Sequence, residues 1–191
     1  MSAEQPLARQ SLFAALKKGL IVSCQVQADD PIFLEGLAAK MAAGAYWAGA
    51  DIIALDCTGR LVNGRPAYAL LADIRLEIPK AILFADIATY EEAQNAVALG
   101  ADIVAPTLNG YTAATAQANA PDFPALEKMC RDFSHQAYVF MEGGINTPEE
   151  AAKALDLGAH AVVVGSAITR PHLIAKRFVQ KILAQQGSSS I

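Results

Sequence analysis

Short apolar runs alternate with longer amphipathic segments along most of the chain. The runs are rich in Ile, Val, Leu and Ala, which is typical of strands that are buried on both faces. They lie at residues 20–24, 52–55, 81–85, 102–105, 137–141 and 159–164. Apolar residues at helical spacing predict helices at 6–18, 33–48, 66–76, 89–99, 123–133, 147–157 and 171–185. The pattern therefore predicts an α/β fold in which six strands alternate with helices, after one N-terminal helix.

Such alternation favours a parallel sheet with right-handed crossovers, for which a (βα) barrel of TIM type is the natural solution. An open doubly wound sheet is the alternative. Internal repetition supports repeated βα units. The helix-capping sequence Thr-x-Glu-Glu-Ala begins at Thr89 and again at Thr147, and each of these helices is followed by a glycine at the same distance from its cap, Gly100 and Gly158. We expect one domain over residues 1–186 and a mobile tail at 187–191. The last helix is expected to bury Leu173, Ile174, Phe178, Ile182 and Leu183.

Composition limits the partners that this chain can have. Just over half of the 191 residues are apolar, which is ample for a core, and the net charge is −4 with no run of Lys or Arg. This balance argues against nucleic acid or an anionic membrane as the main partner. No apolar stretch reaches membrane-spanning length and the N-terminus has no signal-peptide core, so we expect a cytoplasmic protein. Cys24, Cys57 and Cys130 fit reduced thiols, and no metal-ligand spacing is present.

Two glycine-rich loops follow the last two predicted strands. Glu142 ends the first of these strands and is followed by Gly143 and Gly144, and Gly165 and Ser166 follow the second strand. Each loop leads to a helix N-terminus, where free backbone amides form a ready site for a phosphate. In barrels of this type the phosphate site lies after strands 7 and 8. The sequence thus predicts a phosphate site with a carboxylate beside it.

Other polar residues also follow predicted strands. Gln25, Asp56 and Asp86 each come directly after an apolar run. Asp56 suits an Asx-turn as well as a binding role, and Asp86 suits a cap on the loop to Thr89 as well as a contact to a substrate hydroxyl. Arg170 at a helix start opposes the helix dipole, which indicates an anion nearby.

Several motifs together resemble one enzyme family over nearly the whole chain. They are Ser23-Cys24-Gln25, Ala50–Asp56, Phe84–Thr89, Thr107–Thr112 and Val164–Pro171. These segments look like those of the N-acetylmannosamine-6-phosphate 2-epimerase family, which interconverts the 6-phosphates of N-acetylmannosamine and N-acetylglucosamine in sialic acid catabolism. The Gly-Gly and Gly-Ser loops alone are weak evidence, whereas Asn-Gly-Tyr-Thr and Ala-Ile-Thr-Arg-Pro are far more particular.

The resemblance implies roles for individual residues. Glu142 matches the family's catalytic glutamate, and Asp86 matches an aspartate that lines the sugar site. Gln25 matches a substrate-contacting glutamine and Arg170 an arginine near the phosphate. Gly143, Gly165 and Ser166 match positions in the phosphate loops. The resemblance thus adds a specific substrate, a phosphorylated N-acetyl amino sugar, to the phosphate site.

The chain departs from the family pattern in three places. It has Gly144 where the family usually has Arg, and Asn109 where the family usually has Ser. The family also has two further βα units at the point where Ala50 runs directly into Asp51, so the chain provides six strands instead of eight. The absent segment would carry the family's catalytic lysine and an arginine.

Epimerisation at carbon 2 requires a base to remove a proton next to a carbonyl, stabilisation of the anion, and return of the proton to the other face. A partly buried Glu142 suits the base, and no redox cofactor is required. We expect such an isomerase, acting as a homodimer. One alternative is a non-catalytic phosphosugar-binding barrel. A weaker one is another phosphate-barrel enzyme, such as a thiamine-phosphate or pyridoxal-phosphate synthase.

Overall fold

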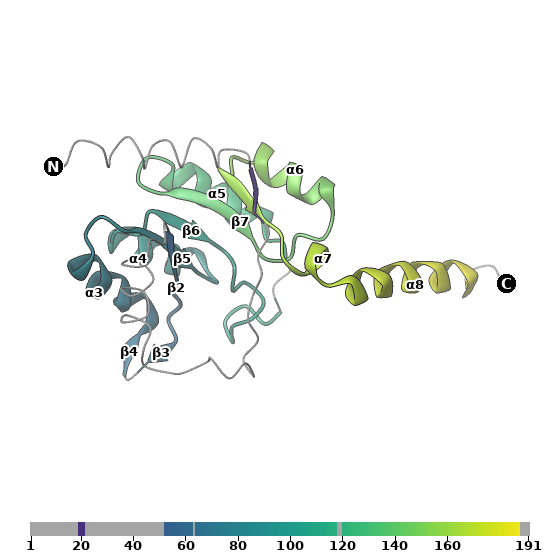
Figure 1. Cartoon of the computed structure of the whole chain (residues 1–191), viewed down its shortest axis with the longest axis horizontal. Coiled ribbons are helices and arrows are strands. Elements are labelled where there is room, and N and C mark those ends of the chain that lie inside the picture. The colour runs from purple at the N-terminus through teal and green to yellow at the C-terminus, as the bar shows by residue number, and fades with distance from the viewer. Residues whose placement is uncertain (1–18, 22–51, 63, 118–119, 188–191) are drawn as a thin grey trace.

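The computed structural model describes residues 19–21, 52–62, 64–117 and 120–187, and a parallel sheet forms its centre (Figure 1). In the order of their pairing, the strands are β1 (Gly19–Ile21), β8 (Ala161–Val163), β7 (Tyr138–Glu142), β6 (Ile103–Ala105), β5 (Ile82–Asp86) and β2 (Ile52–Asp56). All five pairings are parallel. The predicted α/β class and the six predicted strands are therefore confirmed.

Within the described residues the sheet does not close. β1 and β2 form its two edges and have no pairing with each other. A barrel of this type closes with eight tilted strands, so six strands leave an arc that is too short. The described strands follow one another in barrel order, and the opening lies between β1 and β2, where the sequence predicts two βα units fewer than the family has.

Four helices cover one face of the sheet. They are α3 (Leu70–Glu77), α4 (Tyr90–Ala98), α5 (Phe123–Phe133) and α6 (Pro148–Asp156). The buried residues of all four helices belong to one core cluster. The same cluster contains the strand residues that point toward the helices, such as Leu83, Val104 and Val139. The alternate strand residues, including Phe84, Ile103 and Phe140, form a second cluster that contains strand residues only. Helices on a single face are the arrangement of a barrel wall, and they exclude a doubly wound sheet for this part of the chain.

The capping residues position these helices as the sequence predicts. Thr89 accepts a hydrogen bond from the backbone of Glu92 and Thr147 accepts one from Glu150, and both glutamates complete a capping box. The bounds of α5 are those predicted. The helix predicted at 66–76 begins later, because β3 (Leu61–Val62) and β4 (Arg65–Pro66) form a hairpin and residues 67–69 form a 3₁₀ turn.

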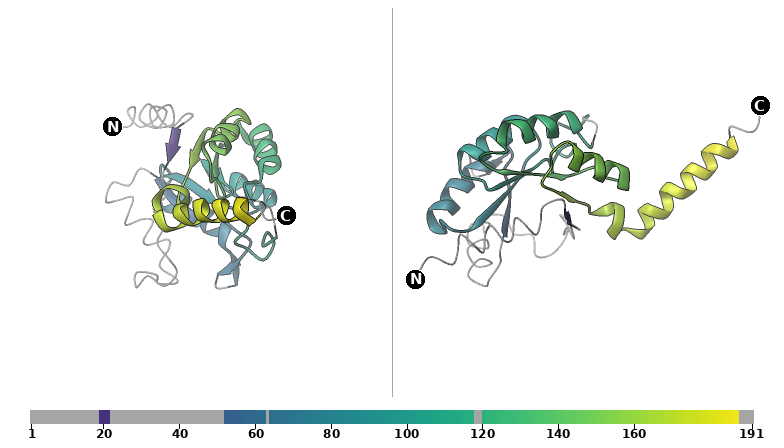
Figure 2. Two further views of the ribbon diagram at one scale, coloured as in Figure 1. Left: turned by 90° about the vertical axis from the view of Figure 1, so that its right-hand side faces the viewer. Right: turned by 90° about the horizontal axis from the view of Figure 1, so that it is seen from above.

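The prediction that the last helix buries its apolar side chains is wrong. After the short helix α7 (Ser166–Thr169), α8 (Pro171–Gly187) runs away from the rest of the protein (Figures 1 and 2). Phe178 is 68% exposed, Ile182 is 53% exposed and Leu183 is 59% exposed, whereas Leu173 and Ile174 are half-buried near the start of the helix. The apolar spacing correctly predicts the helix, but no other described element covers its distal half.

Some predictions lie outside the described residues. They are the helices at 6–18 and 33–48, the strand-end residue Gln25, and residues 188–191 of the tail.

Candidate active site

Four polar side chains come from the carboxyl ends of neighbouring strands, and we call them the strand-end group: Asp56, Asp86, Thr107 and Glu142. Successive strand residues point to opposite faces. On β5, Ile82 and Phe84 belong to the inner cluster of strand residues, and Asp86 continues this alternation. On β7, Glu142 has the same relation to Phe140. The two carboxylates predicted to be catalytic thus lie on the face that no described helix covers.

The register of the sheet places the strand-end group along one rim. Asp56 and Asp86 are directly paired residues of β2 and β5. Asp86 is paired in turn with Ala105 of β6, and Thr107 follows two residues later. The ladder between β6 and β7 pairs Val104 with Val139, so that Glu142 extends beyond the level of Asp86. The sequence predicts that these residues follow strands, and the pairing of the strands brings them to one rim of the sheet.

Asp86 is held in a largely buried position. The hydroxyl of Thr107 donates a hydrogen bond of 2.5 Å to its Oδ1 atom. Burial raises the pKa of Asp86 to about 6; the Thr107 bond opposes this shift and the nearby Asp56 adds to it. A carboxyl group that titrates near neutral pH can both accept and donate a proton under physiological conditions.

Asp56 has a different environment. Its Oδ1 atom accepts hydrogen bonds from the backbone amide of Thr58 at 2.9 Å and from the Thr58 hydroxyl at 2.7 Å. Its Oδ2 atom accepts bonds from the guanidinium of Arg60. Partial burial disfavours the charged form, but the bonds from Thr58 and Arg60 outweigh it and lower the pKa of Asp56. The Asx-turn that the sequence suggested is present, and Asp56 stays ionised.

The loop after β6 is anchored to the loop after β5. The amide of Leu108 donates to the carbonyl of Ile87 at 3.0 Å, and the side-chain amide of Asn109 donates to the carbonyl of Ala88 at 3.3 Å. Asn109 is buried, and within the described structure its Oδ1 atom has no hydrogen-bond partner. Asn109, which departs from the family pattern, therefore lies in the interior between the two loops.

The glycine loop after β7 requires glycine for local reasons. Gly143 and Gly144 have φ values of 102° and 75°, in the left-handed region. A Cβ atom on Gly143 would lie 2.9 Å from the carbonyl oxygen of Pro106, and one on Gly144 would lie 2.6 Å from the Cβ of Ala120. The close approach of Ala120 leaves no room for a side chain at position 144 in this conformation.

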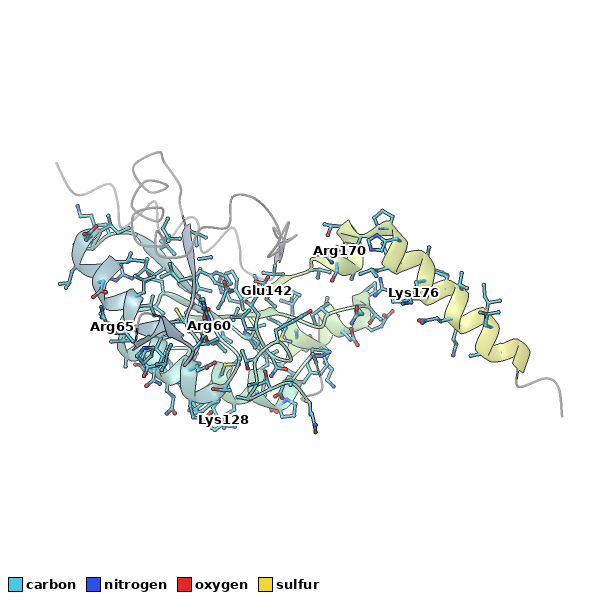
Figure 3. The ribbon with its side chains drawn as sticks, turned by 90° about the horizontal axis from the view of Figure 1, so that it is seen from below. Arg60, Arg65, Lys128, Glu142, Arg170 and Lys176 are labelled. Atoms are coloured by element: carbon cyan, nitrogen blue, oxygen red, sulfur yellow. The ribbon has the colours of Figure 1, made fainter. Side chains whose placement is uncertain are left out.

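The loop after β8 leads directly into α7. Gly165 precedes the first residue of that four-residue helix, Ser166, and Arg170 follows its last residue. A cleft of about 180 Å³ lies beside this loop, lined by Asn146, Ser166, Ala167, Leu173, Lys176, Arg177 and Gln180. Arg177 donates to the side chain of Asn146 at 2.9 Å and to the carbonyl of Ala167 at 3.3 Å, which joins α8 to both glycine loops. In the view of Figure 3, Glu142 lies between Arg60 and Arg170.

Sequence reasoning missed Thr107, Arg60 and the cleft residues of α8. In the sequence, the only signal for Thr107 was that it begins the segment Thr107–Thr112, which resembles the epimerase family. The signal for Arg60 was its position four residues after Asp56 in a predicted loop. Lys176 and Arg177 follow Arg170 by less than two helical turns, but the contact of Arg177 with Asn146 depends on the direction of α8.

Other chemistries find little support in the part of the chain that the structure describes. It contains no group of three or more His, Cys, Asp or Glu residues that could hold a metal ion. None of its helices is long and apolar enough to cross a membrane. Burial, together with the charges of Asp86, Asp56 and Glu92, raises the pKa of the Cys57 thiol, which disfavours its thiolate form.

Comparisons with known proteins identify the family of this chain. Residues 21–184 match the NanE family, described as "Putative N-acetylmannosamine-6-phosphate epimerase". A relative of that name, a 2-epimerase from Caldanaerobacter subterraneus, is 44% identical over 147 residues, which cover 74% of this chain and 60% of the relative. One from Enterobacter is 47% identical over 137 residues, which cover 70% of this chain and 57% of the relative. The chain thus spans about three fifths of the length of these two relatives.

Two further comparisons extend over almost the whole relative. The 2-epimerase from Latilactobacillus sakei is 32% identical over 222 aligned positions, which cover 87% of this chain and 95% of the relative. This alignment is longer than the 191 residues of the chain, so the relative carries residues that have no counterpart here.

The solved structure of the N-acetylmannosamine-6-phosphate 2-epimerase from Clostridium perfringens has a TM-score of 0.68 and 33% identity, and the match covers 88% of this chain and 95% of that chain. Because the family match extends from residue 21 to residue 184, the chain belongs to the NanE family of N-acetylmannosamine-6-phosphate epimerases.

Proposed function

We propose that this protein is an isomerase that interconverts N-acetylmannosamine 6-phosphate and N-acetylglucosamine 6-phosphate. The observation that carries the proposal is the position of Glu142 and Asp86 on the inner face of the sheet, at the same rim as the two glycine loops. This rim is the carboxyl end of the strands, where barrel enzymes have their active sites.

In the proposed reaction the sugar is bound in its open-chain form. Glu142 removes the proton from carbon 2, the electron pair of that C–H bond forms a double bond to carbon 1, and the carbonyl pair moves to the oxygen. Asp86, whose pKa is raised to about 6, donates its proton to the opposite face of carbon 2 as the carbonyl at carbon 1 forms again. Proton exchange with water then returns Glu142 and Asp86 to their starting states. β6 separates the two strands that carry these residues, so their backbones lie two strand spacings apart, roughly 10 Å. That separation leaves room for a sugar between the carboxyl groups.

We assign the phosphate to the glycine loops. Gly143 and Gly144 expose backbone without side chains, and Gly165 directly precedes α7, which begins at Ser166. Arg170 is half-buried beside that helix and supplies a positive charge. Asp56 faces the sugar from β2, and Gln25, which lies outside the described residues, completes the proposed substrate contacts.

The competing proposal is a phosphosugar-binding protein without turnover. It is favoured by one observation: none of the described lysines lies at the carboxyl end of a strand. Lys80 precedes β5, whereas Lys128, Lys153, Lys176 and Lys181 lie on helices. Two acidic residues on opposite sides of the substrate suffice for proton removal and return, and for this reason we place the enzyme first.

Proton exchange at carbon 2 separates the two proposals. The protein is incubated with N-acetylmannosamine 6-phosphate in heavy water, and deuterium at carbon 2 is followed by NMR. We expect incorporation with the wild type and a loss of about 10²- to 10⁴-fold in rate for Glu142→Gln, since this substitution removes the general base. Glu149→Gln, on the exposed first turn of α6, is the matched control and should keep the wild-type rate. Phosphosugar binding without any incorporation would establish the binding protein instead.

The assembly and location that we propose are a homodimer in the cytoplasm. A row of exposed apolar side chains on α8 supports the dimer, namely Phe178, Val179, Ile182 and Leu183. We call these four residues the α8 stripe. Large exposed apolar patches are typical of association surfaces. The free thiols of Cys57 and Cys130 and the phosphorylated substrate support a reducing, intracellular compartment and a role in the catabolism of sialic acid.

A further inference from the structure

One cation is fixed at the rim of the sheet by a member of the strand-end group. The Nε and Nη2 atoms of Arg60 lie 3.1 Å and 2.7 Å from Oδ2 of Asp56. The other carboxylate oxygen of Asp56 is occupied by two bonds from Thr58. Asp56 is therefore anchored on both oxygens, and it holds the guanidinium of Arg60 in one orientation at the end of β2.

The register of the sheet brings this cation next to the proposed reaction centre. Asp56 and Asp86 are paired residues on adjacent strands, which lie about 4.8 Å apart. The side chain of Arg60 is 60% exposed at the rim. Its Nη1 atom donates to none of the residues that the structure describes, so this side of the guanidinium can donate hydrogen bonds to a ligand bound beside Asp86.

The reaction needs a positive charge at this place. Three of the four residues of the strand-end group are carboxylic acids, and removal of the carbon 2 proton by Glu142 transfers the negative charge of that carboxylate to the oxygen of carbon 1. Hydrogen-bond donors aimed at such a charge give some of the largest single contributions to catalysis. No described lysine is at a strand end, and in the view of Figure 3 Arg170 lies on the other side of Glu142 from Arg60.

We propose that Arg60 contacts the oxygen on carbon 1 of the substrate and stabilises the anion that forms there, with Asp56 as its positioning residue. This inference rests on the proposed function and deepens it. Arg60 transfers no proton, since the proton moves between carbon 2 and the carboxyl groups. The hydrogen bonds that Arg60 donates become stronger as the carbonyl oxygen becomes negative. The shortened barrel thereby obtains a cation from the loop after β2.

The hairpin that follows β2 offers a matched control for the test. Arg65 is also an arginine of this segment, is 61% exposed and forms an ion pair of 3.0 Å with Asp73, away from the strand-end group. Arg60→Met, Arg60→Lys and Arg65→Met would be compared by the rate of deuterium incorporation at carbon 2 and by kcat and KM separately. Thermal unfolding of each variant establishes that it is folded.

We expect Arg60→Met to lower kcat by about 10²- to 10³-fold with a smaller change in KM, because the contact strengthens in the transition state. Arg60→Lys should retain part of the rate, and guanidinium ion at millimolar concentration should partly restore Arg60→Met. Arg65→Met should behave as the wild type. Normal kcat in both Arg60 variants, or a rise in KM alone, would overturn the inference. An inactive wild-type protein would instead contradict the proposed function.

Discussion

At the scale of single residues, Asp56 and Asp86 lie at the same rim of the sheet, but their pKa values shift in opposite directions because their immediate partners differ. Asp56 receives bonds from Thr58 and Arg60 and remains charged. Asp86 receives one bond from Thr107 in a largely buried site, and its pKa rises to about 6. The sequence shows two aspartates after two strands, but it does not show that one is paired with a guanidinium. Their separate chemical roles therefore arise from their contacts.

Asp86 should make the stability of the protein fall as the pH rises. Its pKa is higher in the folded protein than the ordinary value of 3.8, so the folded state binds a proton that the unfolded state has released between about pH 4 and pH 6. The free energy of unfolding consequently decreases through this range. Between pH 5 and pH 7.5, the free energy of unfolding should fall by about 1–2 kcal/mol less in Asp86→Asn than in the wild type, because one pKa unit corresponds to about 1.4 kcal/mol.

Urea unfolding of the wild type and of Asp86→Asn at the two pH values measures this difference. The same variant should lose most of its conversion of N-acetylmannosamine 6-phosphate into N-acetylglucosamine 6-phosphate, because Asp86 delivers the proton to the opposite face, while it gains stability at pH 7.5. A wild type and a variant with equal pH dependence would show that Asp86 is charged in the folded protein.

At the scale of elements, short polar networks fix the strands and helices at the end of the sheet opposite the active site. The guanidinium of Arg75, near the end of α3, donates to the carbonyls of Pro79 and Ala81 and forms an ion pair of 2.8 Å with Asp102. Asp102 also accepts a bond from the backbone of Leu83 at the start of β5. One half-buried pair thus joins α3, β5 and the segment before β6.

Loss of this pair should be costly, whereas loss of an exposed pair should not. Arg75→Met removes the ion pair with the partly buried Asp102 and the bonds to the carbonyls of Pro79 and Ala81, and we expect a decrease of roughly 2–4 kcal/mol in the free energy of unfolding. Arg65→Met removes an exposed pair with Asp73 and should cost less than about 1 kcal/mol. Denaturant unfolding of both variants gives the comparison. Equal losses would show that Arg75 is not a structural anchor.

At the scale of the whole molecule, α8 projects from the sheet with the α8 stripe exposed. A 17-residue helix with large apolar side chains at helical spacing is stabilised when that face is covered. A second copy of the chain is the occupant that we propose, because two such helices present the same surface to each other.

Sedimentation analysis tests this assembly. The wild type should sediment as a dimer, and Phe178→Asp combined with Ile182→Asp should yield a monomer, since charged side chains cannot be buried at an apolar interface without a large cost. Lys181→Asp, on the same helix but outside the α8 stripe, is the control and should remain dimeric. A dimeric double variant would place the interface elsewhere on the molecule.

The sequence by itself determined the strands, the capped helices and the positions of Glu142, Asp86 and the glycine loops, because these depend on periodicity and on local backbone chemistry. It also indicated that two βα units are absent. Only the tertiary structure decided what depends on contacts between distant segments: the opening between β1 and β2, the different environments of Asp56 and Asp86, the close approach of Ala120 to Gly144, and the direction of α8. Apolar spacing shows which face of a helix is apolar, but whether another element covers that face is fixed only when the whole chain has packed.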